Sequence, residues 1–140
     1  MNVKELMAQP VIQVSAEDTC QRAAQLMRDQ QAGALVITSK EGIVQGIITD
    51  RDLVVRCMAL GGDPGLRLVG DVSDLHPTTI QPDMDVEEAM ELMRGAGVRR
   101  LPVVDGQSRA VGMLSMDDVA KDVRRYVDAF ATVASQYSRG

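Results

Sequence analysis

Two stretches of the sequence decide the fold: Gly46-Ile47-Ile48-Thr49-Asp50-Arg51-Asp52 and Gly112-Met113-Leu114-Ser115-Met116-Asp117-Asp118. In each stretch an apolar run ends at a hydroxyl residue, and a carboxylate follows three positions later. This pattern predicts a strand that delivers the chain directly to the start of a helix. The first amides of such a helix favour an anion, so both junctions are candidate sites for a phosphate group.

The two stretches belong to a longer internal repeat. The offset of 66 positions that relates Gly46 to Gly112 also pairs Leu26 with Leu92 and Leu35 with Leu101. The register holds without a gap over roughly 50 positions, which indicates two copies of one structural unit. Each copy predicts the order β-α-β-β-α, so the fold class is α/β (α+β) with mixed sheets.

The hydrophobic pattern places these elements. We expect one helix on Cys20, Ala23, Ala24 and Met27, and its counterpart on Val86, Ala89, Met90 and Met93. The expected strands are Ala34–Thr38 and Ile43–Ile48 in the first copy and Leu101–Val104 and Ala110–Leu114 in the second. Short helical turns are expected at Val3–Met7 and Val69–Leu75, each followed by a short extended segment that ends at Val14 or Ile80. Closing helices are expected from Asp50 and from Met116, the second running past Phe130. The tail from Gln136 is expected to fray. The expected organisation is therefore 1–62, 66–125 and a C-terminal extension over 126–140, with Gly61-Gly62-Asp63-Pro64-Gly65 as the connector.

Composition excludes several classes of function. The chain has 140 residues and a net charge of −5, with 15 Lys and Arg against 20 Asp and Glu, which argues against nucleic acid as the main partner. No apolar run approaches the ~18 residues of a membrane span, and residues 1–5 do not resemble a secretion signal, so we expect a cytoplasmic protein without a membrane partner. Cys20 and Cys57 lie in apolar helical patterns without a C-x-x-C spacing, and we expect buried reduced thiols.

Both junctions resemble the G-h-x-[ST]-x-x-[DN] signature of cystathionine-β-synthase-type (CBS) domains, and Val98-Arg99-Arg100-Leu101-Pro102-Val103-Val104-Asp105 resembles the helix-to-strand passage of the same family. The resemblance spans about Val3 to Arg125 and is to small stand-alone bacterial CBS-pair proteins, also called Bateman modules. It implies two motifs related by a pseudo-two-fold axis, with ligand clefts between them. The implied function is a non-catalytic regulatory sensor, in energy sensing for example, that requires no cofactor and binds AMP, ADP or ATP, with S-adenosylmethionine or NAD as further ligands. It also implies a homodimer and a separate effector protein.

The family assigns each cleft its signature residues from one repeat and strand-start residues from the other. Carried over, the first cleft consists of Ile47, Thr49, Arg51, Asp52, Pro77, Thr78, Val98, Arg99 and Arg100. The second consists of Met113, Ser115, Asp117, Asp118, Pro10, Val11, Ala32, Gly33 and Ala34. The three arginines favour phosphate in the first cleft, whereas adjacent Asp117 and Asp118 disfavour an anion in the second. Val36 departs from the family pattern, because the second copy has Pro102 at that position.

Two other interpretations stay open from the sequence. Thr-x-x-Asp and Ser-x-x-Asp at a helix start also form a capping box, which needs no ligand. The chain could be a protein-interaction or dimerisation scaffold with vestigial clefts. Catalysis is not expected, since no motif supplies a nucleophile with a positioned base, and the only histidine, His76 beside Pro77, is expected in a surface turn.

Overall fold

The first repeat is a three-stranded sheet with one helix packed on it. In a computed structural model, which describes residues 1–138, β1 pairs in parallel with β2, and β2 pairs antiparallel with β3. The elements are β1 (Gln13–Val14), α1 (Cys20–Gln30), β2 (Ala34–Thr38) and β3 (Val44–Thr49). The predicted β-α-β-β order and the mixed sheet are therefore confirmed.

The second repeat has the same order with a smaller sheet. Its elements are α4 (Val86–Ala96), β4 (Arg100–Val104), β5 (Ala110–Ser115) and α5 (Met116–Ser138). The counterpart of β1 is reduced to a single parallel bridge between Ile80 and Val103. Pro77 and Pro82 flank this segment and have no N–H to donate, which limits its pairing.

Capping residues set the ends of the two equivalent helices. The Thr19 side chain accepts from the Arg22 amide before α1, and the Asp85 side chain accepts from the Glu87 amide before α4. α4 ends at Gly97, whose φ of 68° is a left-handed conformation that glycine adopts without strain. The buried faces are Cys20, Ala23 and Met27 on α1 and Val86, Ala89 and Met93 on α4. Ala24 and Met90, which were expected on these faces, are exposed instead because they lie at the edge of the apolar stripe.

The helices that close the two repeats differ. In the first repeat the chain forms one turn of α-helix, α2 (Asp50–Asp52), then the π-helical η2 (Leu53–Cys57) and the 3₁₀-helical η3 (Met58–Leu60), before it stops at Gly61. In the second repeat α5 is one α-helix of 23 residues. It continues through Ser138, so the expected fraying is wrong for 136–138; residues 139 and 140 lie outside the described residues.

The two repeats exchange their N-terminal segments. Val3, in η1 (Val3–Glu5), is buried in the core of the second repeat, and its amide donates to the Met84 carbonyl over 2.9 Å. Val69 and Val72, in α3 (Val69–Val72), are buried in the core of the first repeat, where the Val69 amide donates to Asp18. Each core therefore contains residues from both halves of the sequence.

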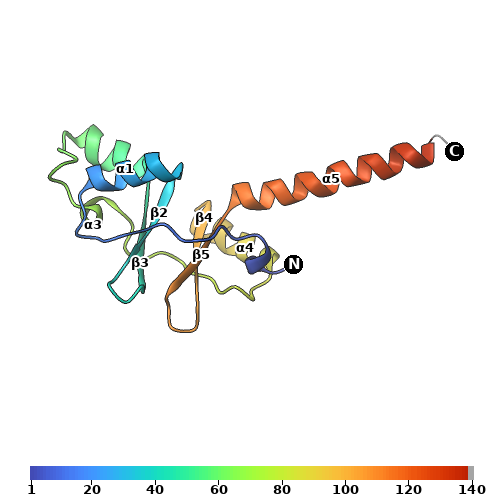
Figure 1. Cartoon of the computed structure of the whole chain (residues 1–140), viewed down its shortest axis with the longest axis horizontal. Coiled ribbons are helices and arrows are strands. Elements are labelled where there is room, and N and C mark those ends of the chain that lie inside the picture. The colour runs from blue at the N-terminus through green and yellow to red at the C-terminus, as the bar shows by residue number, and fades with distance from the viewer. Residues whose placement is uncertain (139–140) are drawn as a thin grey trace.

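The tips of the two hairpins also join the repeats. The Val44 amide donates to the Ser108 carbonyl and the Ala110 amide donates to the Gly42 carbonyl, each over 3.0 Å. Figure 1 shows the β2–β3 and β4–β5 hairpins side by side, with α5 extending away from both sheets. The predicted pair of repeats thus forms one continuous structure rather than two units on a flexible linker.

Candidate functional site

Both signature motifs form capping boxes. Thr49 Oγ1 accepts from the Asp52 amide over 3.2 Å, and the Thr49 amide donates to Asp52 Oδ2 over 2.9 Å. At the start of α5, Ser115 Oγ accepts from the Asp118 amide over 3.1 Å, and the Ser115 amide and hydroxyl both donate to Asp118 Oδ2. The capping interpretation of these residues is therefore confirmed.

The second oxygen of each carboxylate distinguishes the two motifs. Asp52 Oδ1 lies 3.7 Å from Arg56 Nε, one helical turn further on. Asp118 Oδ1 accepts none of the hydrogen bonds found among residues 1–138. Asp118 Oδ1 is therefore available to a ligand, whereas Asp52 Oδ1 already lies beside Arg56.

A pocket of about 290 Å³ opens beside Ser115 and Asp118. Its walls come from the N-terminal segment, from the passage between α1 and β2, and from the β5–α5 junction. The lining residues are Ala8, Pro10, Val11, Ile12, Gln31, Ala32, Gly33, Ala34, Val36, Arg100, Met113, Ser115, Asp117, Asp118 and Lys121. All nine residues assigned to the second cleft from the sequence line this one pocket.

Arg100 lies in this pocket, although the sequence analysis assigned it to the first cleft. The β4–β5 register places Arg100 directly opposite Ser115, and a β-carbon on Gly33 would lie 3.2 Å from Arg100 Nη2. The half-buried guanidinium thus reaches the passage before β2. The Asp50 carboxylate is also there, with Oδ2 3.3 Å from the position of a β-carbon on Gly33. Lys121, one turn after Asp117 on α5, is a second cation at the pocket. Two cations therefore accompany the two carboxylates, and the expected repulsion of an anion is offset.

The residues assigned to the first cleft are brought together less completely. The Ile47 amide donates to the Asp74 carbonyl over 3.0 Å, so the edge of β3 already has a partner there. Thr78, Val98, Arg51 and Arg99 are exposed, and Arg99 borders a small hollow beside Ser115 and Asp117. Pro77 lines a separate groove of about 540 Å³, which contains neither Thr49 nor Asp52.

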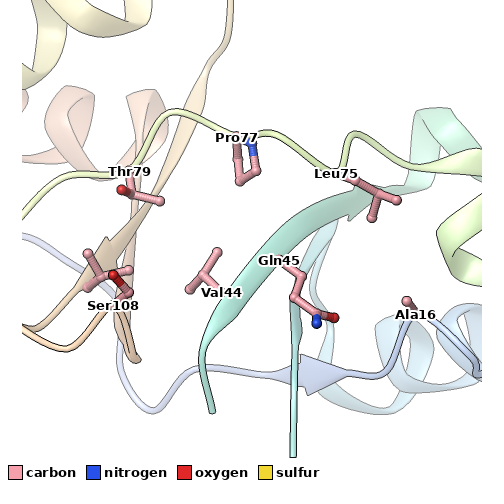
Figure 2. Close-up of a pocket in the computed structure, with 8 residues that line it drawn as sticks. Ala16, Val44, Gln45, Leu75, Pro77, Thr79 and Ser108 are labelled. Atoms are coloured by element: carbon pink, nitrogen blue, oxygen red, sulfur yellow. The ribbon is translucent and has the colours of Figure 1, made fainter. Parts of the chain in front are cut away.

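This separate groove lies between the segment 75–79 and the hairpin residues Val44, Gln45 and Ser108. Figure 2 shows Leu75, Pro77 and Thr79 of this segment above Val44 and Gln45, with Ser108 at one end and Ala16 at the other. Alternate residues of an extended segment point to opposite sides, so Leu75, Pro77 and Thr79 face away from Thr78. The groove contains no charged side chain among its lining residues.

The signature glycines make room for the chain itself. A β-carbon on Gly46 would collide with the Asp74 carbonyl oxygen, and one on Gly112 would collide with the Met7 side chain. Each signature strand is therefore approached closely by another segment of the chain, through backbone at Gly46 and through a side chain at Gly112. The space beside each glycine is filled by the segment that crosses from the other repeat.

Several residues missed by the sequence analysis belong to the pocket: Ala8, Ile12, Gln31, Val36 and Lys121. Four of them lie within two positions of a predicted residue, so a wider window around each motif would have included them. Lys121 could have been found from the four-residue spacing to Asp117 along the predicted helix.

The remaining reactive groups lie elsewhere. His76 is exposed, and its amide donates to Asp74 Oδ1, as in a surface turn. Cys20 and Cys57 are free and buried in the first core, and burial together with neighbouring Cys57 raises the pKa of the Cys20 thiol to about 11. Within residues 1–138 there is no group of three or more His, Cys, Asp or Glu side chains that could hold a metal ion, and no helix is long and apolar enough to cross a membrane.

A CBS domain matches the chain twice, over residues 3–58 and 69–125, and both matches coincide with the structural repeats. The chain therefore belongs to the CBS-domain family, as a pair of CBS motifs. It is 37% identical over 119 residues to the CBS domain-containing protein YhcV of Bacillus subtilis, covering 85% of this chain and 83% of that protein. It is 34% identical over 119 residues to the uncharacterized protein MK0525 of Methanopyrus kandleri, of which it spans 61%.

Solved structures show the same fold. The structure of Hypoxic Response Protein I with two coordinated zinc ions is 30% identical, with a TM-score of 0.78 over 86% of this chain and 98% of that one. The CBS domain pair of protein MJ0100, in complex with 5′-methylthioadenosine and S-adenosyl-L-methionine, has a TM-score of 0.83 at 21% identity, covering 90% and 98%. The CBS domain protein PAE2072 from Pyrobaculum aerophilum, complexed with AMP, has a TM-score of 0.77 at 23% identity, covering 84% and 89%.

Proposed function

We propose that this CBS pair is a non-catalytic regulatory module that binds an adenosine-containing ligand in the pocket beside Ser115 and Asp118. The observation that carries the proposal is the composition of this pocket. It joins a helix start, an available carboxylate oxygen and an apolar wall, and these come from both repeats.

Each part of such a ligand has a chemical counterpart in the pocket. The start of α5 and the Arg100 guanidinium suit a phosphate or carboxylate group. Asp118 Oδ1 suits the vicinal hydroxyls of a ribose, which are hydrogen-bond donors. Val11, Ile12 and Met113 offer apolar contacts to a base.

Size and charge narrow the class of ligand. A volume of about 290 Å³ lies near the lower end of roughly 300–1,000 Å³ for small-molecule sites, which favours one nucleoside over a dinucleotide such as NAD. Arg100 and Lys121 are balanced by Asp117 and Asp118, so the pocket has little net charge to neutralise a triphosphate. We therefore expect AMP or S-adenosylmethionine to bind more tightly than ATP. The ligands in the MJ0100 and PAE2072 structures support an adenosyl ligand for this fold.

A ligand in this pocket would act on the contact between the repeats. The N-terminal segment is held to β5 by reciprocal hydrogen bonds between Ala8 and Met113, of 2.8 and 3.2 Å. Both residues line the pocket, so an occupant contacts both sides of this junction. A ligand that prefers one spacing of the junction would shift the orientation of α5, and a protein that contacts this helix would sense the change.

The test is a calorimetric titration with AMP, ADP, ATP, S-adenosylmethionine and 5′-methylthioadenosine, followed by the best ligand against two matched variants. Asp118→Ala should abolish binding, whereas Asp52→Ala, the same substitution in the other signature, should leave the affinity within about threefold. In thermal unfolding, a ligand at 100 times its dissociation constant stabilises by ~2.7 kcal/mol, or roughly 5–10 °C for this size.

The reverse pattern, with binding lost in Asp52→Ala and kept in Asp118→Ala, would move the site to the first cleft, where the arginine argument from the sequence placed a phosphate. No heat and no thermal shift with any of the five compounds at millimolar concentration would favour the alternative function, an interaction scaffold whose signature residues only cap helices.

A further inference from the structure

The carboxylate of Asp50 belongs to the first signature but lies against the wall of the pocket beside Ser115 and Asp118. Asp50 is the first residue of α2, and its amide donates to the Gly33 carbonyl over 3.0 Å. A β-carbon on Gly33 would lie 3.3 Å from Asp50 Oδ2, and Gly33 lines the pocket. The first repeat therefore places a negative charge next to a pocket whose signature residues come from the second repeat.

The two oxygens of this carboxylate have different surroundings. Oδ1 accepts from the Arg51 amide over 2.8 Å, which is a local contact at the helix start. Oδ2, on the side of Gly33, accepts none of the hydrogen bonds found among residues 1–138. Asp50 is also absent from the ion pairs in this part of the chain, which are Arg28–Asp29, Arg56–Asp52 and Arg94–Glu91. Its negative charge is therefore not neutralised by a contacting cation.

Arg100 reaches the same place from the second repeat. Its Nη2 lies 3.2 Å from the position of a β-carbon on Gly33, and Asp50 Oδ2 lies 3.3 Å from that position. Because glycine has no side chain, a guanidinium and a carboxylate from different repeats face the same space without forming one of the ion pairs found in residues 1–138. An anionic group bound by Arg100 would therefore lie close to Asp50 as well.

Asp50 changes the charge balance of the pocket. Arg100 and Lys121 are matched by Asp117 and Asp118, which line the pocket with them. Asp50 adds a third carboxylate beside Arg100, so three carboxylates stand against two cations. The Asp50 side chain is exposed, and salt therefore weakens its repulsion of an anion, but charges closer together than the Debye length still interact.

We infer that Asp50 is a specificity-determining residue of this pocket, which selects adenosine-containing ligands by the charge of the group on the 5′ carbon. The inference rests on the proposed function. A phosphate on that carbon is attracted by Arg100 but repelled by Asp50. A neutral thioether is little affected, whereas a sulfonium with its amino acid chain has a net positive charge and is attracted. The first repeat thus adjusts the ligand preference of a site whose signature lies in the second.

A purely structural role for Asp50 predicts a different result. An acidic residue in the first turn stabilises a helix through its dipole, and Oδ1 adds the contact with the Arg51 amide. Asp50→Asn keeps the shape of the side chain and an oxygen that can accept from this amide, but it removes the charge. This variant therefore tests the charge without removing the local contact.

The test is titration calorimetry of the full chain and of Asp50→Asn with AMP, 5′-methylthioadenosine and S-adenosylmethionine, which are anionic, neutral and net positive. The substitution should tighten the binding of AMP about 3–10-fold and change that of 5′-methylthioadenosine less than about twofold. It should weaken the binding of S-adenosylmethionine about 2–3-fold. The gain for AMP should shrink in about 0.5 M NaCl, because the Debye length then falls to a few ångströms.

Two further variants control for net charge and for side-chain identity. Asp83→Asn removes the same charge at an exposed residue that lines a different groove, and should change each of the three affinities less than about twofold. Asp50→Glu keeps the charge and should keep the wild-type order of affinities. Because Asp50 and Asp83 are exposed, circular dichroism should show the same folded chain in all three variants.

The outcomes separate this inference from the proposed function. If a ligand binds but Asp50→Asn leaves the affinity for AMP relative to the other two compounds unchanged, the inference alone is overturned. An equal gain or loss for all three ligands has the same meaning, since it indicates altered packing and not charge. No binding of any of the three compounds at millimolar concentration, to the wild-type chain or to Asp50→Asn, overturns both.

Discussion

Ser115 and Asp118 satisfy each other at the start of α5: the Ser115 hydroxyl donates to Asp118 Oδ2 over 2.9 Å, and the Asp118 amide donates back to Ser115 Oγ over 3.1 Å. The pair caps a helix and at the same time faces a pocket. A structural role and a binding role therefore rest on the same two side chains, and the first predictions separate them.

Replacing the serine measures the capping role. Ser115→Ala removes the acceptor of the Asp118 amide and should lower the free energy of unfolding by about 1 kcal/mol, the usual cost of losing a capping side chain. Urea denaturation followed by circular dichroism gives this value. Thr49→Ala at the equivalent position is the natural comparison, and a cost well above 2 kcal/mol in either variant would show that the hydroxyl has a further structural contact.

Arg100 should determine how well the pocket holds an anionic ligand. Arg100→Ala removes a charged hydrogen-bond donor from the pocket and should weaken AMP binding about 10–100-fold. Titration calorimetry at two salt concentrations measures the loss. Arg51→Ala, which alters an exposed arginine of the first signature, should leave the affinity within about threefold; equal losses in both variants would contradict the placement of the ligand beside Ser115.

Glycine substitutions test the close approach of the crossing segments. Gly46→Ala places a β-carbon against the Asp74 carbonyl oxygen, and because both partners are backbone, the strand or the segment has to move. We expect a loss of about 2–3 kcal/mol or more. Gly95→Ala is the control, since a β-carbon there meets nothing within 4 Å and lies inside α4. It should stabilise the chain by up to about 1 kcal/mol through helix propensity.

The buried thiol predicts how stability depends on alkaline pH. The pKa of Cys20 is raised from 9.0 to about 11, first by burial and then by neighbouring Cys57. Above pH 9 the unfolded chain loses this proton while the folded chain keeps it, so stability falls as the pH rises through 9 to 11. The loss is on the order of 2–3 kcal/mol for a shift of this size. Denaturant titrations at pH 8, 9, 10 and 11 measure it, and Cys20→Ala should flatten the curve relative to the wild-type chain.

Most helices and strands could be predicted from the sequence because their hydrophobic patterns and capping residues agree with the packing. β2 begins and ends where predicted, at Ala34 and Thr38, since both faces of this strand are covered and its residues form a continuous apolar run. The start of α5 was found from the serine and aspartate that cap it. The irregular helix after Thr49 was not predicted. Its residues have the same helical spacing as their counterparts in α5, and the π-helical turn at Leu53–Cys57 has no local sequence signal.

The residues that line the pocket were predicted more successfully than the charge of the pocket, because Arg100 was assigned to the other cleft. The nine residues of the second cleft could be named in advance because the resemblance to CBS domains assigns them, and all nine line one pocket. The position of Arg100 depends on how far a long side chain reaches from the second repeat toward Gly33 of the first, which is a property of the packed pair and not of the single repeat. The exchange of Val3 and Val69 between the cores has the same origin.

Because of this exchange, neither repeat can complete its core without the other. A protease cut between Gly61 and Gly65 would yield two fragments, each deprived of valines that its own core requires: the first would lack Val69 and Val72, and the second would lack Val3. Neither fragment would therefore have a complete core alone, whereas the two fragments together contain all the residues of both cores. A substitution in one half of the sequence can therefore destabilise the core of the other repeat.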